Sequence, residues 1–281
     1  RGDNKRELKD KRIIVSGCAK GMGEATLNSY VKAGAHVIGM DIDSELGQTV
    51  AENANKNDEG KSSFLPVDIG NPQSVSEAFA KASNLLGGLD VLAHPAAIHS
   101  LGDPSLISPE DWDRMFTINV RGTMLTNQAA FHQLKKSGGG SIINFGSISG
   151  LRPEPSSAAY SASKGAVHSW TRTAAGAWGK DKVRVNAILP AMATPMYKQA
   201  NASMSEEAAT ASYWMNHRSI ALGEKYGDPE TDLGPVMVFF ASDASRFITG
   251  QRIPVDGGQA SIRSFALPIE LKRYNGNGHL P

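Results

Sequence analysis

Short apolar runs alternate along the chain with longer segments in which apolar residues recur every three or four positions. The first pattern predicts strands buried on both faces, and the second predicts helices that bury one side. The expected strands are residues 12–16, 36–41, 63–68, 90–94, 141–146, 184–189 and 252–255. The expected helices are residues 23–33, 44–55, 72–86, 109–136, 157–179 and 232–242. This order predicts an α/β fold: a doubly wound, parallel, seven-stranded sheet with helices on both faces.

No repeat, low-complexity linker or break in composition divides the 281 residues, so we expect 1–281 to form one domain. Residues 192–227 lack a strand pattern and are rich in Ala, Met and Ser, which predicts a helical flap over the substrate. Residues 261–281 follow the last strand as a C-terminal tail, and the sequence leaves open whether this tail docks on the body or on another subunit.

The charge of the chain is nearly balanced, with 29 Lys and Arg against 28 Asp and Glu. This balance gives no general attraction to nucleic acid, to anionic membranes or to acidic substrates. A single cysteine, Cys18, excludes an internal disulfide and fits a reducing compartment. The seven histidines are scattered, so we expect no metal site. The polar start and the lack of a long apolar run predict a cytoplasmic protein.

The first expected strand runs directly into a turn that contains Gly17, Gly21 and Gly23. Such glycines permit a tight turn and a close approach to a pyrophosphate at a helix N-terminus, as in Rossmann-type folds. Asp41 ends the second strand, where a carboxylate accepts hydrogen bonds from the adenosine ribose and repels a 2′-phosphate. Lys20 would instead favour that phosphate. The balance favours NAD over NADP, with a helix cap for Asp41 and a solvated charge for Lys20 as alternative roles.

Tyr160 and Lys164 stand four residues apart in an expected helix, and Ser147 ends the strand before it. The spacing places the phenol and the ammonium on one helix face. A nearby ammonium is expected to lower the pKa of the Tyr160 phenol, so that it serves as a general base for an alcohol. The Ser147 hydroxyl is expected to hydrogen-bond the substrate oxygen as charge develops there.

Taken together, these motifs resemble the short-chain dehydrogenase/reductase family from Leu8 to about Gly258. The matching positions are Gly17, Gly21, Gly23, Asp68, Ile69, Asn119, Ser147, Tyr160, Lys164, the segment 186–190, Thr194 and the segments 249–250 and 256–258. The resemblance implies a catalytic tetrad of Asn119, Ser147, Tyr160 and Lys164. It also implies that Asn119 opens its helix to hold a water, that Lys164 binds the nicotinamide ribose, and that a homotetramer forms across helices 109–136 and 157–179.

The chain departs from that family at two turns that face the cofactor. Residues 94–97 are His-Pro-Ala-Ala where the family usually has Asn-Asn-Ala-Gly, and Ala191 follows Pro190 where glycine is usual. We expect His94 to be packed or hydrogen-bonded rather than catalytic. The full set of expected cofactor contacts is Gly17, Lys20, Gly21, Met22, Gly23, Asp41, Ile42, Asp68, Ile69, Ala96, Ala97, Tyr160, Lys164, Pro190, Met192 and Thr194.

The sequence therefore predicts an NAD-dependent oxidoreductase that interconverts a secondary alcohol and a ketone, with Tyr160 as general acid and base. The expected substrate contacts are Ser147, Ser149, His99, Tyr197 and Trp214, with Leu151 and Tyr213 as further wall candidates. Their apolar and aromatic character favours a hydrophobic, cyclic or aromatic substrate, although Tyr213 and Trp214 could equally pack the flap against the body. The alternatives are a catalytically weak or inactive cofactor-binding scaffold, an NADP-preferring carbonyl reductase, or a methyltransferase on a similar sheet.

Overall fold

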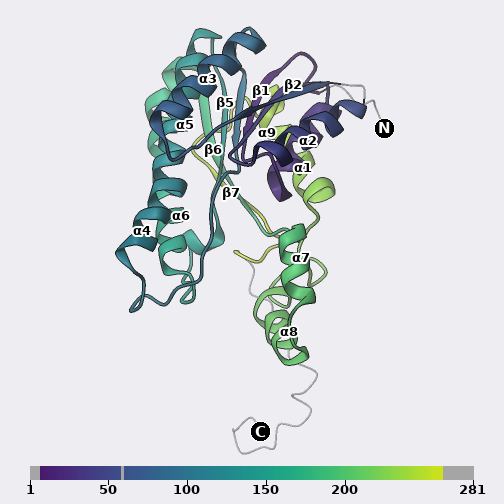
Figure 1. Ribbon diagram of the computed structural model, residues 1–281, viewed down its shortest axis with the longest axis vertical. Helices are drawn as coiled ribbons and strands as arrows, with labels where there is room; N and C mark the ends of the chain where they lie inside the picture. Colours follow the sequence, from purple (N-terminus) through teal and green to yellow (C-terminus); the bar gives the residue numbers. More distant parts are fainter. Residues whose placement is uncertain (1–6, 58–59, 262–281) are drawn as a thin grey trace, which may run out of the picture.

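The computed structural model describes residues 7–57 and 60–261, and within them seven parallel strands form one sheet (Figure 1). The strands are β1 (Arg12–Ser16), β2 (His36–Asp41), β3 (Lys61–Pro66), β4 (Val91–His94), β5 (Gly140–Phe145), β6 (Val183–Pro190) and β7 (Arg252–Val255). Their order is β3-β2-β1-β4-β5-β6-β7, so the direction of winding reverses between β1 and β4. In such a sheet the crevice outside the carboxyl ends of the strands at the reversal is the expected ligand site. The predicted seven-stranded fold is confirmed.

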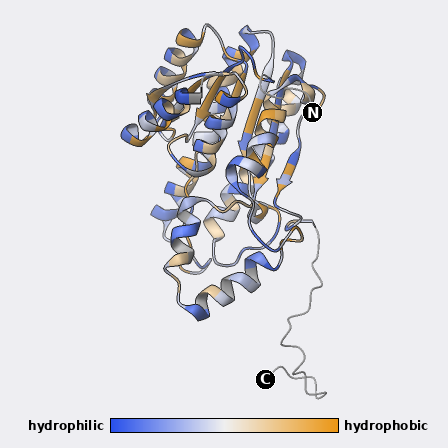
Figure 2. Ribbon diagram, turned by 90° about the vertical axis from the view of Figure 1, so that its right-hand side faces the viewer, coloured by the Kyte–Doolittle hydropathy of each residue, from blue (hydrophilic) through white to orange (hydrophobic). Residues whose placement is uncertain are grey.

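Alternate residues of the central strands point to opposite faces of the sheet, as a strand period of two requires. Ile13 and Val15 of β1 pack under α1 (Gly21–Lys32), α2 (Ser44–Ala54) and α9 (Gly234–Ala241). Ile14 packs on the other face under α3 (Pro72–Leu86), α5 (Gly122–Lys136) and α6 (Ala158–Trp178). Figure 2 shows the apolar strands between the more polar helices. Burial on both faces explains why the strands are nearly continuous apolar runs.

Side-chain caps set the starts of two helices where the sequence predicts them. The Asn71 side chain accepts the backbone N–H of Gln73 and Ser74 at the start of α3, and Pro72 follows it. The Ser108 hydroxyl accepts the Asp111 N–H at the start of α4 (Pro109–Phe116). These are the two proline-preceding cap positions, so the predicted helix starts at residues 72 and 109 are confirmed.

Two predicted elements are wrong in detail. The expected helix 109–136 is divided, because a π-helical segment, Thr117–Arg121, separates α4 from α5. The expected strand 63–68 lies two residues earlier as β3, because pairing with β2 starts at His36 opposite Lys61. Beyond Pro66 the chain already turns toward α3, since the Asp68 N–H donates to the Ser74 hydroxyl and not to a strand.

The predicted flap forms two helices, α7 (Pro195–Ala202) and α8 (Glu206–Ser212), and the π-helical segment Tyr213–His217, which lie beyond the carboxyl end of β6 (Figure 1). Its two ends meet in a short parallel bridge. The Ala193 N–H donates to the Gly227 carbonyl oxygen at 2.8 Å, and the Gly227 N–H donates to the Ala191 carbonyl oxygen at 3.0 Å. Backbone hydrogen bonds therefore hold the two ends of the flap together. Of the predicted tail, residues 262–281 lie outside the described residues.

Candidate active site

The glycine turn after β1 is folded too tightly for any other residue. Gly17 has φ +88°, and a Cβ there would lie 2.6 Å from the backbone of Ala96. A Cβ at Gly23 would overlap the Gly17 carbonyl oxygen, because the start of α1 packs against the turn. Among the described residues no side chain caps α1, so no side chain occupies the N–H groups of its first turn. The arrangement fits a pyrophosphate, whose charge the helix dipole favours.

The altered segment 94–97 is held firmly against this turn. The Ala96 N–H donates to the Ser16 carbonyl oxygen at 3.0 Å, and the His94 Nδ1 lies 2.6 Å from the Ser16 hydroxyl. Burial lowers the pKa of His94 to about 3, so its imidazole is neutral. His94 is packed and hydrogen-bonded, as predicted. The proline and alanine of the segment therefore leave its contact with the glycine turn intact.

Asp41 lies next to the glycine turn at the end of β2. One carboxylate oxygen accepts the Ala19 N–H at 3.0 Å, and the other accepts the Asp43 N–H at 3.1 Å. Asp43, and not Asp41, caps α2, which removes the alternative cap role that the sequence allowed for Asp41. A carboxylate has about four acceptor positions, so these two bonds leave capacity for a ribose hydroxyl. Lys20 is exposed at the start of α1.

The residues expected to contact the adenine end of the cofactor do not all lie together in the structure. Ile42 and Asp68 line one cleft of about 380 Å³ beside β3 and α3. Ile69, in contrast, is buried in the core under α3 and α5. The Asp68 side chain accepts the Gly70 N–H at 2.9 Å, and Asn71, not Asp68, caps α3. Ile42 is 74% exposed, which makes it an available surface for a base to pack on.

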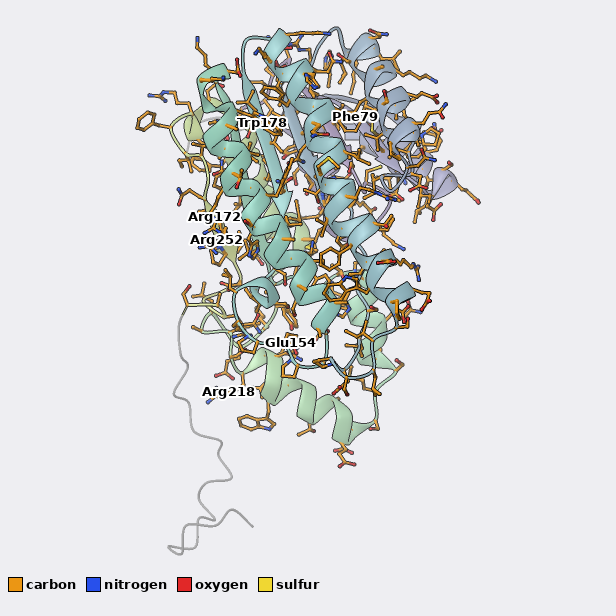
Figure 3. All side chains as sticks on the ribbon, turned by 90° about the vertical axis from the view of Figure 1, so that its left-hand side faces the viewer. Phe79, Glu154, Arg172, Trp178, Arg218 and Arg252 are labelled. Carbon is orange, nitrogen blue, oxygen red and sulfur yellow. The ribbon has the colours of Figure 1, made fainter. Side chains whose placement is uncertain are left out.

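Tyr160, Lys164 and Ser147 lie close together where α6 begins and β5 ends; Figure 3 shows Glu154 near this end of α6 and Trp178 at the other. The Lys164 Nζ donates to the Phe145 carbonyl oxygen at 2.8 Å and lies 5.6 Å from the centre of the Tyr160 ring. This hydrogen bond uses one of the three donors of an ammonium. Burial lowers the pKa of Lys164 to about 8.

The expectation that Lys164 lowers the pKa of Tyr160 is wrong for this structure. Burial raises the pKa of Tyr160, and hydrogen bonding with Ser147 offsets this only in part. The physical reason is that burial of the phenol disfavours its charged form. Ser147 is thus the group that favours the phenolate here.

Asn119 sits in the π-helical segment and joins three parts of the chain. Its side chain exchanges two hydrogen bonds with the Ile98 backbone, at 2.8 and 2.9 Å, and donates to the Ser163 hydroxyl at 3.1 Å. The Asn119 carbonyl oxygen accepts the Thr123 hydroxyl at 2.7 Å. The helix is therefore wound more widely at Asn119, in agreement with the opening that the family resemblance implies. Sequence reasoning missed Ser163, which also donates to the Tyr160 carbonyl oxygen and whose spacing of three from Tyr160 was a usable signal.

Two of the expected substrate residues contact the Tyr160 and Ser147 side chains. The His99 ring packs edge-on against the Tyr160 ring with centres 4.6 Å apart, and His99 Nε2 lies 3.1 Å from the Ser157 hydroxyl. The Ser147 and Ser149 hydroxyl oxygens lie 3.2 Å apart. His99 and Ser149 therefore flank the reacting position. Nearby, Arg152 donates to the Gln259 carbonyl oxygen at 3.0 Å and so ties the loop after Ser147 to the chain beyond β7.

The other expected substrate residues pack mainly with one another. We call Tyr197, Tyr213, Trp214, His217 and Tyr226 the flap aromatic cluster. The Tyr197 hydroxyl contacts His217 Nε2, and the Tyr197 ring meets Tyr226 edge-on at 4.8 Å. Tyr213 stacks on His217 at 5.9 Å and meets Trp214 edge-on at 5.6 Å. The packing role that the sequence allowed for Tyr213 and Trp214 is therefore present, and both side chains remain more than one third exposed.

Within residues 7–57 and 60–261, no group of three or more His, Cys, Asp and Glu side chains is placed to hold a metal ion. No helix in those ranges has the length and apolar character that a membrane crossing requires.

Comparisons with known proteins define the family. Residues 17–260 match a family model described as Enoyl-(Acyl carrier protein) reductase. The chain is 34% identical over 254 residues to a cyclopentanol dehydrogenase of Comamonas sp. (strain NCIMB 9872), covering 89% of this chain and 97% of that one. It is 32% identical over 252 residues to the 2,5-dichloro-2,5-cyclohexadiene-1,4-diol dehydrogenase LinX of Sphingobium indicum, covering 89% and 96%. It is 31% identical over 257 residues to 2-(S)-hydroxypropyl-CoM dehydrogenase 3 of Xanthobacter autotrophicus, covering 91% and 98%.

Comparison with solved structures indicates the same family as the sequence comparisons. A short-chain type dehydrogenase/reductase from Mycobacterium ulcerans superposes with a TM-score of 0.84 at 28% identity, covering 92% of each chain. The chain belongs to the short-chain dehydrogenase/reductase family, and within it to the NAD(P)-dependent enzymes that act on alcohols. The methyltransferase alternative is thereby removed.

Proposed function

We propose that this protein oxidises a hydrophobic, ring-shaped secondary alcohol to a ketone with NAD, and catalyses the reverse reduction. The observation that carries the proposal is the grouping of Ser147, Tyr160 and buried Lys164 where β5 ends and α6 begins. The names of two relatives, cyclopentanol dehydrogenase and a cyclohexadiene-diol dehydrogenase, support ring alcohols as the substrate class. The name of a third relative denotes an acyclic substrate, so the preference for a ring rests on the first two and on the apolar walls.

Each of the site residues has a separate role in the proposed reaction. Bound nicotinamide supplies the hydride acceptor for oxidation and the hydride donor for reduction. The Tyr160 oxygen takes the hydroxyl proton of the alcohol, and the Ser147 hydroxyl donates a hydrogen bond to the same substrate oxygen. The hydrogen bond with Ser147 favours the phenolate, and the Lys164 ammonium, which donates to the Phe145 carbonyl oxygen, has further donors available to ribose hydroxyls. Asn119 holds the loop after β4 and the start of α6 in register through Ile98 and Ser163.

The proposed preference for NAD rests on Asp41. Its carboxylate is fixed by Ala19 and Asp43 at the place where a 2′-phosphate would meet a negative charge. Asp41→Asn keeps an acceptor oxygen and removes the charge. We expect kcat/KM with NADP to rise relative to NAD by about tenfold or more in this variant, and Lys20→Ala to lower whatever use of NADP the wild type has. An unchanged ratio in Asp41→Asn would place the discrimination elsewhere.

A panel of substrates tests the reaction itself. It should contain cyclopentanol, cyclohexanol, an aromatic secondary alcohol, a short acyclic alcohol and an enoyl thioester, each assayed with NAD and NADP in both directions. The enoyl thioester is included because of the description of the matched family model. Turnover of ring alcohols with NAD supports the proposal. Turnover of the thioester alone would replace it with double-bond reduction, and cofactor binding without turnover of any compound would favour the scaffold alternative.

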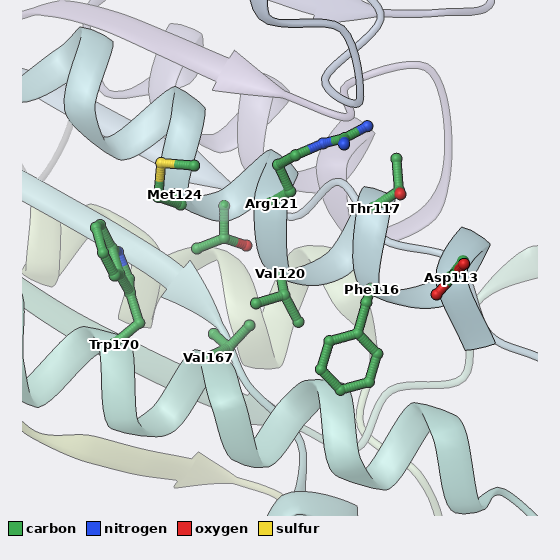
Figure 4. Close-up of a pocket in the computed structure, with 9 residues that line it drawn as sticks. Asp113, Phe116, Thr117, Val120, Arg121, Met124, Val167 and Trp170 are labelled. Atoms are coloured by element: carbon green, nitrogen blue, oxygen red, sulfur yellow. The ribbon is translucent and has the colours of Figure 1, made fainter. Parts of the chain in front are cut away.

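The proposed homotetramer would use the outer face of α4, α5 and α6. A groove of about 550 Å³ lies there, lined by Asp113, Phe116, Thr117, Val120, Arg121, Thr123, Met124, Val167 and Trp170 (Figure 4). Its mostly apolar lining fits a second copy of the chain. Light scattering should give a mass four times 29.8 kDa, and Met124→Glu should lower it. A wild-type mass of one chain would contradict the assembly.

A further inference from the structure

The imidazole of His168 lies directly behind the Ser147 backbone. His168 follows Lys164 by four residues and Tyr160 by eight, so the three side chains share one face of α6. His168 is 2% exposed. The Ser147 N–H donates to His168 Nε2 at 3.3 Å. The helix that carries the tyrosine and the lysine therefore also contacts the strand end that carries the serine.

Glycines on both sides of Ser147 make room for this ring. A Cβ at Gly146 would overlap His168 Nε2, and a Cβ at Gly150 would lie 2.8 Å from His168 Cε1. Neither glycine has a positive φ, so neither is required by its backbone conformation. At Gly146 the imidazole is the nearest obstacle to a side chain, and at Gly150 the backbone of Lys164 and Gly165 lies equally close.

The ring is held in the form that accepts a hydrogen bond at Nε2. Burial, and then the charges of Arg252 and Lys164, lower the pKa of His168 to about 4, so the imidazole is neutral at pH 7. Arg172, one turn further along α6, acts in the same direction, and Figure 3 labels it and Arg252. A neutral ring that accepts at Nε2 carries its proton on Nδ1. Nε2 is the ring nitrogen that accepts the Ser147 N–H, so the buried Nδ1 is the one that carries the proton.

Ser147 needs such a partner because the sheet ends just before it. The Gly146 N–H makes the last bond between β5 and β6, to the Ile188 carbonyl oxygen at 2.8 Å. After Ser147 the chain enters the short helical turn Ile148–Gly150, and the Ser147 hydroxyl accepts the Ser149 N–H at 3.2 Å. The Ser147 peptide thus connects the strand to the turn, and His168 contacts this peptide.

We propose that His168 is a positioning residue: its Nε2 fixes the Ser147 peptide and thereby directs the Ser147 hydroxyl toward the Tyr160 hydroxyl. The kinetic consequence rests on the proposed dehydrogenase function, while the hydrogen bond itself does not. Misplacing a reacting group by about 1 Å can cost about a hundredfold in rate. A shift of the Ser147 peptide of this size is therefore sufficient to lower the rate.

Two substitutions of similar polarity separate this role from simple packing. The amide oxygen of His168→Gln can reach the place of Nε2, whereas the amide of the shorter His168→Asn reaches only the place of Nδ1. The Gln variant therefore keeps an acceptor for the Ser147 N–H, and the Asn variant loses it. We expect kcat to stay within about threefold of wild type for Gln and to fall about 10- to 100-fold for Asn, with KM nearly constant in both. Exposed His132→Asn on α5 is the matched control and should be unchanged.

A second readout needs neither cofactor nor turnover. Hydrogen exchange of the Ser147 amide should be slow in wild type and Gln, and about tenfold faster in Asn, as expected when one hydrogen bond is lost. Equal exchange in all three proteins, or equal kcat in Gln and Asn, would overturn the proposal. If the chain oxidises no alcohol, the proposed function fails while the exchange experiment still decides the hydrogen bond.

One more variant covers the case in which His168→Asn does not fold. Gly146→Ala keeps His168 but introduces a methyl group where Nε2 lies. We expect it to show the same loss of kcat and the same faster exchange of the Ser147 amide. A Gly146→Ala protein with wild-type exchange and kcat would contradict the proposal.

Discussion

The group around Tyr160 and the flap aromatic cluster are built in opposite ways. Asn119, Ser147, Tyr160 and Lys164 are held by partners from distant parts of the chain, including the Phe145 and Ile98 backbones. The flap aromatic cluster finds its ring contacts within residues 197–226, and its outer rings are half-exposed. The first arrangement fixes atoms for chemistry, and the second leaves side chains free to change with the substrate. We therefore expect substitutions in the first region to change kcat and those in the second to change KM and substrate choice.

The largest effect should come from Tyr160→Phe. The substitution keeps the ring and its contact with His99 but removes the oxygen that exchanges a proton with the substrate. We expect kcat/KM for alcohol oxidation to fall about 10³-fold, within the range typical of general acid–base groups. The measurement is NADH formation, with a thermal unfolding curve to show that the fold is kept. Activity within tenfold of wild type would move proton transfer to another group.

Ser147→Ala should have the next largest effect. It removes the hydroxyl that faces both Tyr160 and the substrate oxygen, and we expect kcat to fall about a hundredfold, as for other donors to a developing oxyanion. Ser149→Ala is the comparison, since its hydroxyl lies 3.2 Å from that of Ser147; we expect it to act mainly on KM. Steady-state kinetics of both variants would contradict this assignment if Ser149→Ala lowered kcat as much as Ser147→Ala.

Acid should destabilise the sheet body through its buried histidines. The pKa of His94 is lowered from 6.5 to about 3, so below pH 6.5 the unfolded chain binds a proton that the folded chain does not. Stability is therefore lost as the pH falls from 6.5 toward 3. Between pH 6.5 and 5 the loss from His94 is about 2 kcal/mol. Urea unfolding at pH 7 and pH 5 measures it, and His94→Asn should flatten the difference; an equal slope in that variant would contradict the assignment.

The smallest effect should come from the flap. Tyr197→Phe removes the hydroxyl that contacts His217 but keeps the ring against Tyr226. We expect KM to change about two- to fivefold with kcat within about twofold, because one part-buried hydrogen bond contributes little. Tyr197→Leu also removes the ring and should enlarge the change in KM and alter the ranking of ring alcohols. A loss of kcat similar to that of Ser147→Ala would contradict the expectation that the flap affects mainly KM.

Local features of the sequence were sufficient for much of the fold and for the outline of the site. Strands β1, β2 and β7 have their predicted bounds, since each is a short apolar run between polar turns. The starts of α3 and α4 followed from a cap residue before a proline. The face shared by Tyr160 and Lys164 followed from helical spacing, and the tight glycine turn from residue type alone. These features depend on neighbours within about one turn of helix or one strand.

Contacts between distant segments decided the rest. The π-helical winding at Asn119 is stabilised by the Ile98 backbone, and the position of β3 is set by pairing with β2. The raised pKa of Tyr160 comes from burial by other elements, which no spacing in the sequence reveals. No local feature of the sequence distinguishes His168, and only the fold places Gly146 and Ser147 against it. The sequence determined which groups are present and which faces they share; the tertiary structure determined their burial and partners, because both depend on segments far apart in the chain.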